Sequence, residues 1–170
     1  RGILPAIWLA QLEEVVGPLS IVFNMVAGTS TGAILGAGIT VPIPDSDNQM
    51  YSVRKILEIY LNRGSELFTT SSVLSTPLSR TIGMLRGGSQ YTAQGKTTIF
   101  KEFFGNRRLA DSKNELLVTA VGGEQTGVIT YSKHHTYQSN QNNPLIADIV
   151  SASSAAPGVF PPHTLSVNEK

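Results

Sequence analysis

Residues 25–37 read M-V-A-G-T-S-T-G-A-I-L-G-A, which places a serine between two glycines where an apolar run gives way to small residues. The apolar, partly β-branched residues 21–27 follow Gly17-Pro18, a pattern typical of a strand buried on both faces of a parallel sheet. Residues 31–39 are rich in alanine, glycine, isoleucine and leucine and predict a buried helix. The sequence therefore predicts a strand, a tight turn and a helix.

The turn fits the pattern G-x-S-x-G, with Gly28 and Gly32 around Ser30 and with Thr29 and Thr31 between them. Such a turn exposes the central hydroxyl and holds its residue in a strained backbone conformation. We expect a side chain at either glycine position to clash, and the helix N-terminus to favour negative charge near the hydroxyl. Two interpretations follow: Ser30 is a catalytic nucleophile, or it merely caps the helix.

The alternation of strands and helices predicts an α/β fold with a mainly parallel sheet, in one domain over residues 1–170. Residues 64–95 are the least regular part, and their scattered apolar and cationic residues suit either a flap at a membrane interface or an ordinary connection over the core. Helices are predicted at residues 5–16, 31–39, 53–63, 97–104 and 145–155, and strands at residues 21–27, 116–121 and 128–131.

The composition suits a globular domain, because 41% of the 170 residues are hydrophobic. The net charge of +1 and the lack of a basic stripe argue against a nucleic-acid partner. The chain has no cysteine and three histidines, which excludes disulfides and argues against a structural zinc site. Absence of cysteine is compatible with a secreted or a cytoplasmic chain. No apolar run reaches about 18 residues, so no membrane span is predicted.

Two pairs of ionisable residues invite a functional interpretation that the sequence does not favour. His134-His135 is expected in a solvated turn beside a lysine rather than at a metal, since neighbouring residues of a strand point to opposite faces. Arg107-Arg108 is expected at a solvated helix end rather than at an anion site. Neither pair is predicted to carry chemistry.

Further stretches add to the one around Ser30. Residues 1–5 read R-G-I-L-P, residues 23–32 read F-N-M-V-A-G-T-S-T-G, and residues 151–162 read S-A-S-S-A-A-P-G-V-F-P-P. With Y-T-A-Q-G-K from residue 91, they resemble the patatin-like phospholipases, a family of lipid acyl hydrolases, and in particular its bacterial members. The resemblance covers nearly the whole chain and implies a three-layer fold with a central sheet flanked by helices. Asn24 stands where the family usually has aspartate.

The resemblance implies a serine–aspartate dyad without histidine, metal or cofactor, in which Ser30 attacks the acyl ester of a phospholipid or galactolipid. Arg1 and Gly2 would be the tail of a glycine-rich loop whose N–H groups hold the oxyanion. The family's aspartate lies in a D-G-G or D-G-A motif, which does not occur up to Lys170. Because the chain starts and stops abruptly, we expect a fragment, with that motif within about 5–20 residues after Lys170.

The aspartates inside the chain are poor substitutes for that carboxylate. Asp148 fits the polar face of a predicted helix, and three others fit caps or solvated loops, namely Asp45, Asp47 and Asp111. Two alternatives to the dyad enzyme remain at this point. One is a non-catalytic lipid- or partner-binding protein that keeps the scaffold, and the other is a Ser-His-Asp esterase with His163 as its base.

Overall fold

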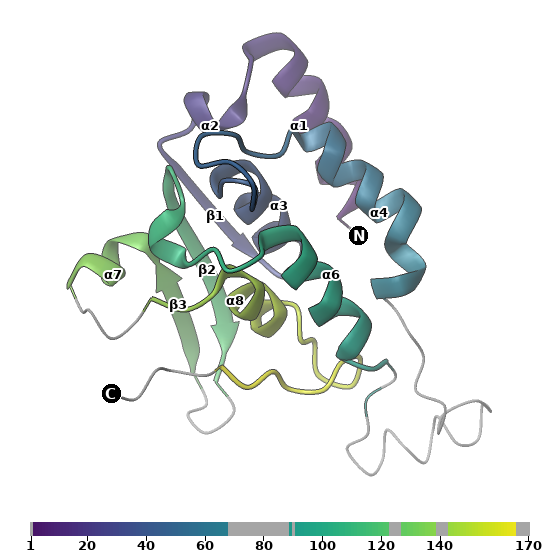
Figure 1. Cartoon of the computed structure of the whole chain (residues 1–170). Helices are drawn as coiled ribbons and strands as arrows, with labels where there is room; N and C mark the ends of the chain where they lie inside the picture. Colours follow the sequence, from purple (N-terminus) through teal and green to yellow (C-terminus); the bar gives the residue numbers. More distant parts are fainter. Residues whose placement is uncertain (1, 68–88, 90, 123–126, 139–142, 166–170) are drawn as a thin grey trace.

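A computed structural model describes residues 2–67, 89, 91–122, 127–138 and 143–165 (Figure 1). Helices flank a small sheet in these residues, which confirms the predicted α/β class. In chain order the elements are α1 (Ile3–Val16), α2 (Leu19–Val22), β1 (Met25–Thr29), α3 (Thr31–Thr40), α4 (Val53–Leu67), α6 (Gln94–Phe104), the 3₁₀ turn η2 (Leu109–Asp111), β2 (Glu115–Val121), β3 (Val128–Ser132), α7 (Lys133–Gln138) and α8 (Ile146–Ser153).

The described sheet has the strand order β1-β2-β3. β1 and β2 are parallel, with Met25 opposite Glu115 and Thr29 opposite Thr119. β2 and β3 are antiparallel, so the sheet is mixed in the part of the chain that is described. The carboxyl ends of the two parallel strands meet at one edge, which is where open α/β sheets bind their ligands.

The main core lies between the sheet and two helices, α3 and α8. Leu116 and Val118 of β2 are fully buried against these helices. α6 packs on α8, and α4 packs on both α3 and α6. Figure 1 accordingly shows α4 and α6 on the side of α3 and α8 that faces away from the strands. The helices thus hold the carboxyl end of β1 in place from one side of the sheet.

The predicted strand over residues 21–27 is wrong in its first half. Leu19–Val22 is the short helix α2, closed by the N–H of Phe23 donating to the carbonyl of Leu19 at 3.0 Å, and β1 begins only at Met25. Over so short an apolar run, periodicity does not separate a helical turn from a strand. Burial on both faces is wrong as well in the described residues, because the β1 side chains alternate between exposed and half-buried.

Two other local predictions need correction. Residues 64–67 belong to α4 and residues 94–95 begin α6, so the irregular segment is shorter at both ends than predicted. Most of the proposed flap falls at residues 68–88 and 90, outside the described residues. His134 and His135 lie in α7 rather than in a turn, although both side chains are exposed as expected.

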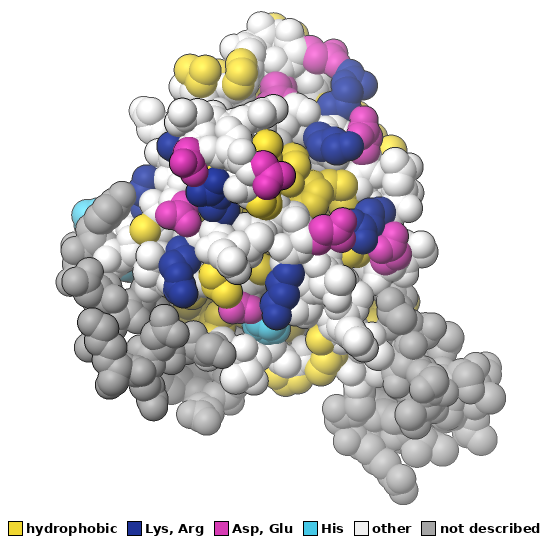
Figure 2. All heavy atoms as spheres, viewed as in Figure 1, with side chains coloured by type: hydrophobic (Ala, Val, Ile, Leu, Met, Phe, Trp, Pro, Cys, Tyr) yellow, Lys and Arg dark blue, Asp and Glu magenta, His cyan; other side chains and the backbone are white. Residues whose placement is uncertain are grey.

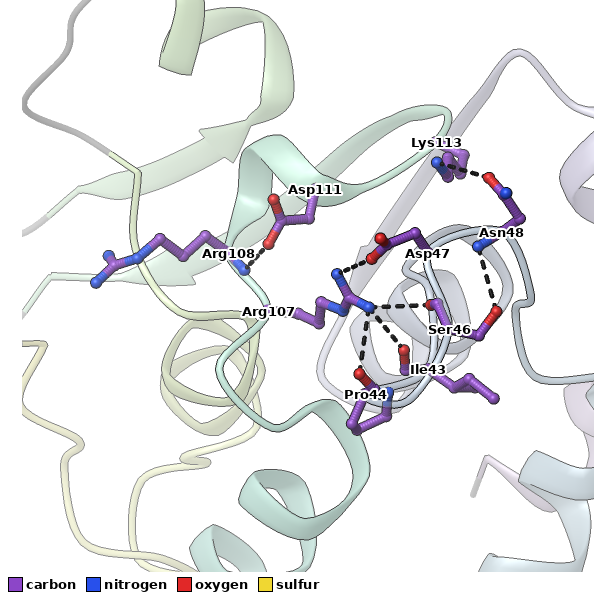
Figure 3. Close-up of polar contacts among 9 residues, drawn as sticks. All are labelled: Ile43, Pro44, Ser46, Asp47, Asn48, Arg107, Arg108, Asp111 and Lys113. Atoms are coloured by element: carbon purple, nitrogen blue, oxygen red, sulfur yellow. Dashed lines mark hydrogen bonds and ion pairs between the residues drawn. The ribbon is translucent and has the colours of Figure 1, made fainter.

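Arg107 is not a solvated residue at a helix end, and that prediction is wrong. Its guanidinium pairs with the carboxylate of Asp47 at 2.8 Å, and its side chain is only 19% exposed. It also donates to three carbonyl oxygens of the loop after α3, those of Ile43, Pro44 and Ser46, at 3.0, 3.3 and 2.9 Å (Figure 3). The five donors of a guanidinium fit such a set of acceptors, so Arg107 fastens this loop to the segment after α6.

The neighbouring arginine has a separate, local role. The backbone N–H of Arg108 donates to the carboxylate of Asp111 at 2.7 Å, at the start of η2. Of the two roles that the sequence leaves open for Asp111, capping or solvation, this contact is the capping one. The Arg108 side chain donates to the carbonyl of Asn143 at 2.7 Å.

The surface carries charges of both signs close together. Figure 2 shows lysine and arginine side chains beside aspartate and glutamate on the face in view. Within the described ranges, no helix is long and apolar enough to cross a membrane. The same ranges contain no group of three or more histidine, aspartate or glutamate side chains that could hold a metal ion.

Candidate active site

Ser30 occupies the turn between β1 and α3 in a strained conformation. Its φ of 55° and ψ of −116° make it the one non-glycine residue with positive φ among those described. Such a conformation costs about 1–3 kcal/mol and persists only when neighbouring structure enforces it. The predicted strained turn is therefore confirmed.

The Ser30 side chain is half-buried, and its hydroxyl has no hydrogen-bond partner among the described residues. Ser30 is the N-cap residue of α3, but its hydroxyl makes no capping hydrogen bond. Its carbonyl instead accepts the N–H groups of Ala33 and Ile34 at 3.1 and 3.2 Å. In the part of the chain that is described, no other group hydrogen-bonds to the hydroxyl, which disfavours the helix-cap interpretation.

The two glycines of the turn have different roles. A Cβ on Gly28 would lie 2.3 Å from both the carbonyl carbon and the oxygen of Gly32, so glycine is required there, as predicted. A Cβ on Gly32 would meet no atom within 4 Å, so the predicted clash at the second glycine is wrong. Gly28 allows the strand and the helix to approach, whereas Gly32 leaves open space next to Ser30.

Ser153, at the end of α8, is hydrogen-bonded to the turn at Ser30. Its hydroxyl accepts the backbone N–H of Ser30 at 2.8 Å and donates to the carbonyl of Thr119 at 2.7 Å. The hydroxyls of Thr29 and Thr119 lie 2.6 Å apart across the β1–β2 pair. Sequence reasoning missed Ser153, which is contained in the S-A-S-S-A-A-P stretch but has no motif position of its own.

A cavity of about 630 Å³ lies at the carboxyl ends of β1 and β2. Its lining residues include Thr29, Thr119 and Ser153, the residues whose hydrogen bonds support the turn at Ser30. This volume is within the range of small-molecule sites in proteins. Most of the remaining wall is apolar, formed by residues that include Val121, Val128, Ala155, Pro157, Phe160 and Pro161.

His163 also lines the cavity and pairs with Asp148. The Nε2 atom of His163 lies 3.1 Å from an Asp148 carboxylate oxygen, and their side chains are 13% and 19% exposed. Asp148 lies on α8, as predicted, but the sequence did not indicate its pairing with His163. The pair joins the loop after α8 to α8 itself, and so fixes one wall of the cavity.

Lys96 is a buried cation close to the same region. Its side chain donates to the carbonyl of Ser151 at 3.0 Å, and its ammonium lies 4.4 Å from the centroid of the Phe160 ring. Lys96 is only 3% exposed, and burial lowers the pKa of its ammonium to about 8. No carboxylate pairs with it in the described part of the chain. Lys96 was part of the Y-T-A-Q-G-K stretch but was not predicted as a site residue.

Gly2 lies beside the turn, whereas Arg1 falls outside the described residues. A Cβ on Gly2 would lie 3.0 Å from the Thr31 Cβ and 3.1 Å from the Tyr60 ring. The Tyr60 hydroxyl donates to the carbonyl of Thr31 at 3.4 Å, and burial raises its pKa. The start of the described chain therefore lies next to Thr31, the first residue of α3.

The strained turn at Ser30 and the cavity beside it lie on an α/β scaffold, and comparison with known families shows which family the chain belongs to. A family model described as patatin-like phospholipase matches residues 1–169, so the chain belongs to the patatin-like phospholipase family.

Three relatives show how distant the similarity is. Patatin-like protein 2 of Oryza sativa subsp. indica is 26% identical over 170 residues, covering 96% of this chain and 42% of the relative. Patatin-07 of Solanum tuberosum is 28% identical over 177 residues, covering 99% and 42%. Patatin-like protein 3 of Arabidopsis thaliana is 25% identical over 176 residues, covering 96% and 41%. The chain thus spans about two fifths of the length of these curated relatives.

Proposed function

We propose that this protein hydrolyses the acyl esters of phospholipids or related lipids, with Ser30 as the nucleophile. Membership of the patatin-like phospholipase family supports lipid hydrolysis in general. The observation that carries the assignment to Ser30 is its strained φ of 55° on a strand-to-helix turn, with a hydroxyl that no other described residue engages. The adjacent cavity of about 630 Å³, with mostly apolar walls, fits an acyl chain.

The proposed reaction proceeds through an acyl-enzyme. The Ser30 oxygen bonds to the ester carbonyl carbon while its proton passes to a carboxylate, and the alcohol of the lipid leaves with that proton. Water then attacks the acyl-enzyme, the fatty acid is released, and the serine hydroxyl is restored. The aspartate expected after Lys170 would supply the carboxylate, since none of the described carboxylates hydrogen-bonds to Ser30.

Two sources of N–H groups would stabilise the oxyanion. The first is the glycine-rich loop expected to end at Arg1 and Gly2, and the packing of Gly2 against Thr31 supports this position. The second is the N-terminus of α3, whose dipole favours negative charge beside Ser30. The substrate would be taken from a membrane surface that the protein contacts transiently.

The test is ester hydrolysis by the full-length protein and its Ser30→Ala variant. With a short-chain nitrophenyl ester and with phospholipid vesicles, we expect Ser30→Ala to lose at least about 10³-fold in kcat while its circular dichroism is unchanged. Ser65→Ala, which removes an exposed hydroxyl from α4, is the matched control and should keep wild-type activity. Hydrolysis by Ser30→Ala at the wild-type rate would refute the nucleophile.

A second candidate, the Ser-His-Asp esterase, is favoured by the pairing of His163, which lines the cavity, with Asp148. The variant His163→Ala separates the two mechanisms, because only the histidine-dependent enzyme would lose activity as completely as Ser30→Ala. The non-catalytic alternative, a lipid- or partner-binding protein, predicts that the wild-type protein binds vesicles without releasing fatty acid.

A further inference from the structure

We propose that Ser153 is a positioning residue for Ser30, and that it holds the nucleophile by its backbone N–H. The catalytic part of this inference rests on the function proposed above. The structural part, that the Ser153 hydroxyl fixes the strained turn, stands on the contacts alone.

The hydrogen bonds of Ser153 leave no ambiguity of direction. A hydroxyl has one proton, and Ser153 donates it to the carbonyl of Thr119 at 2.7 Å. Its oxygen therefore meets the N–H of Ser30, at 2.8 Å, with a lone pair. One side chain thus joins three elements: the β1–α3 turn, the end of β2 and the end of α8.

The Ser30 N–H has no other partner in the described structure. The register of β1 with β2 ends at Thr29 opposite Thr119, so the strand pairing does not reach Ser30. The helical bonds of α3 begin with the N–H groups of Ala33 and Ile34, which both donate to the Ser30 carbonyl. Without Ser153, the N–H of the strained residue would be left unpaired in a half-buried position.

This arrangement constrains the chemistry as well as the fold. Because the Ser30 N–H is bound to Ser153, it is not available to the oxyanion, whose donors must come from other backbone groups. A nucleophile released from this support would also shift relative to the ester carbonyl, and a displacement of about 1 Å can cost about 10²-fold in rate.

The end of α8, which carries Ser153, is itself held in place by a contact with α6. Lys96 on α6 donates to the carbonyl of Ser151, two residues before Ser153. The ammonium lies near the negative end of the α8 dipole, where a cation is favoured. The support of Ser30 therefore extends from α8 to α6.

The test compares Ser153→Ala with two further variants of the full-length protein. Ser153→Thr keeps a hydroxyl at the position. Ser154→Ala is the matched control, because Ser154 is the next residue, is buried, and donates its hydroxyl to the carbonyl of Val150 within α8. Amide hydrogen exchange resolved at Ser30 reads the contact directly, and kcat and KM for a nitrophenyl ester read its catalytic effect.

We expect Ser153→Ala to speed exchange of the Ser30 amide by at least about tenfold and to lower kcat by about 10–100-fold with little change in KM. Ser153→Thr should restore slow exchange and most of kcat, and Ser154→Ala should leave both at wild-type values. Wild-type exchange at Ser30 in Ser153→Ala, or an equal effect of Ser154→Ala, would overturn the contact. Altered exchange with unchanged kcat would overturn the catalytic role. If the wild-type protein hydrolyses no ester, the proposed function fails, and the exchange measurement still decides on the contact.

Discussion

Ser30 combines a strained backbone with a hydroxyl that no described residue hydrogen-bonds, and its neighbours make both possible. Gly28 gives α3 room to start directly after β1, and Ser153 binds the N–H that the turn leaves outside strand and helix. The strain is then maintained by the surrounding elements rather than by Ser30 itself. This explains why a serine, which rarely adopts positive φ, can occupy the position.

The two glycines of the turn provide a prediction with a built-in control. Gly28→Ala should lower the free energy of unfolding by about 1–3 kcal/mol or more, because its Cβ would lie 2.3 Å from the Gly32 backbone, which cannot move aside as a flexible side chain could. Gly32→Ala should be neutral or stabilising by up to about 1 kcal/mol, because its Cβ meets open space in a helix. Denaturant unfolding measures both, and equal losses would contradict the geometry.

At this scale the sequence predicts some residues of the candidate site and not others. Ser30 and Gly28 belong to a local pattern whose spacing follows from the turn, so both could be found without coordinates. Ser153 acts on a residue 123 positions away, and Lys96 on one 55 positions away. Such contacts depend on how helices pack, and no local spacing records them. The sequence also predicts that a side chain at position 32 would clash, but a Cβ there would meet open space.

At the scale of elements, the contact between α6 and α8 includes a buried charge. Lys96 is held by one carbonyl and one aromatic ring, and burial lowers its pKa to about 8. The folded protein therefore releases this proton at lower pH than the unfolded chain does, where the lysine titrates near its ordinary value of about 10.4. Between these two values unfolding takes up a proton, so the stability contributed at this position rises with pH.

This linkage predicts a pH-dependent difference between the wild-type protein and Lys96→Met. The free energy of unfolding of the wild type, relative to that of the variant, should increase from pH 8 to pH 10 by at most about 1.4 kcal/mol per pH unit. Denaturant unfolding at several pH values measures it. Lys101→Met, on the exposed face of the same helix, controls for the loss of a surface charge. A difference that stays flat or decreases with pH would contradict the buried-cation interpretation.

Most elements follow from periodicity, and the exceptions have identifiable causes. α1, α3, α4, α6, α8, β2 and β3 all lie where the apolar pattern predicts them, with ends shifted by a few residues. α2 was missed because four residues are too few for the apolar pattern to separate a helix from a strand, and α7 because its six residues are mostly polar. Arg107 was expected in solvent, since its acceptors are loop carbonyls that no sequence pattern marks.

At the scale of the whole molecule, the site forms where three parts of the chain converge. The last residue of β1, the end of β2 and the segment after α8 all line one cavity at the carboxyl edge of the parallel strands (Figure 1). The residues that line the cavity run from Thr29 to His163, so they are drawn from most of the stretch, residues 1–169, that the family model matches. Because the chain spans about two fifths of its relatives, the proposed activity is to be tested on the full-length protein.

The most direct test of the central claim is covalent labelling of the full-length protein with a fluorophosphonate probe, followed by mapping of the modified residue by mass spectrometry. The probe's phosphorus bonds to an activated serine oxygen as fluoride leaves, so it reports activation without requiring knowledge of the natural lipid. We predict a single label on Ser30, absent from Ser30→Ala and retained in Ser65→Ala. A folded wild-type protein that takes up no label, or carries it on another serine, would contradict the claim.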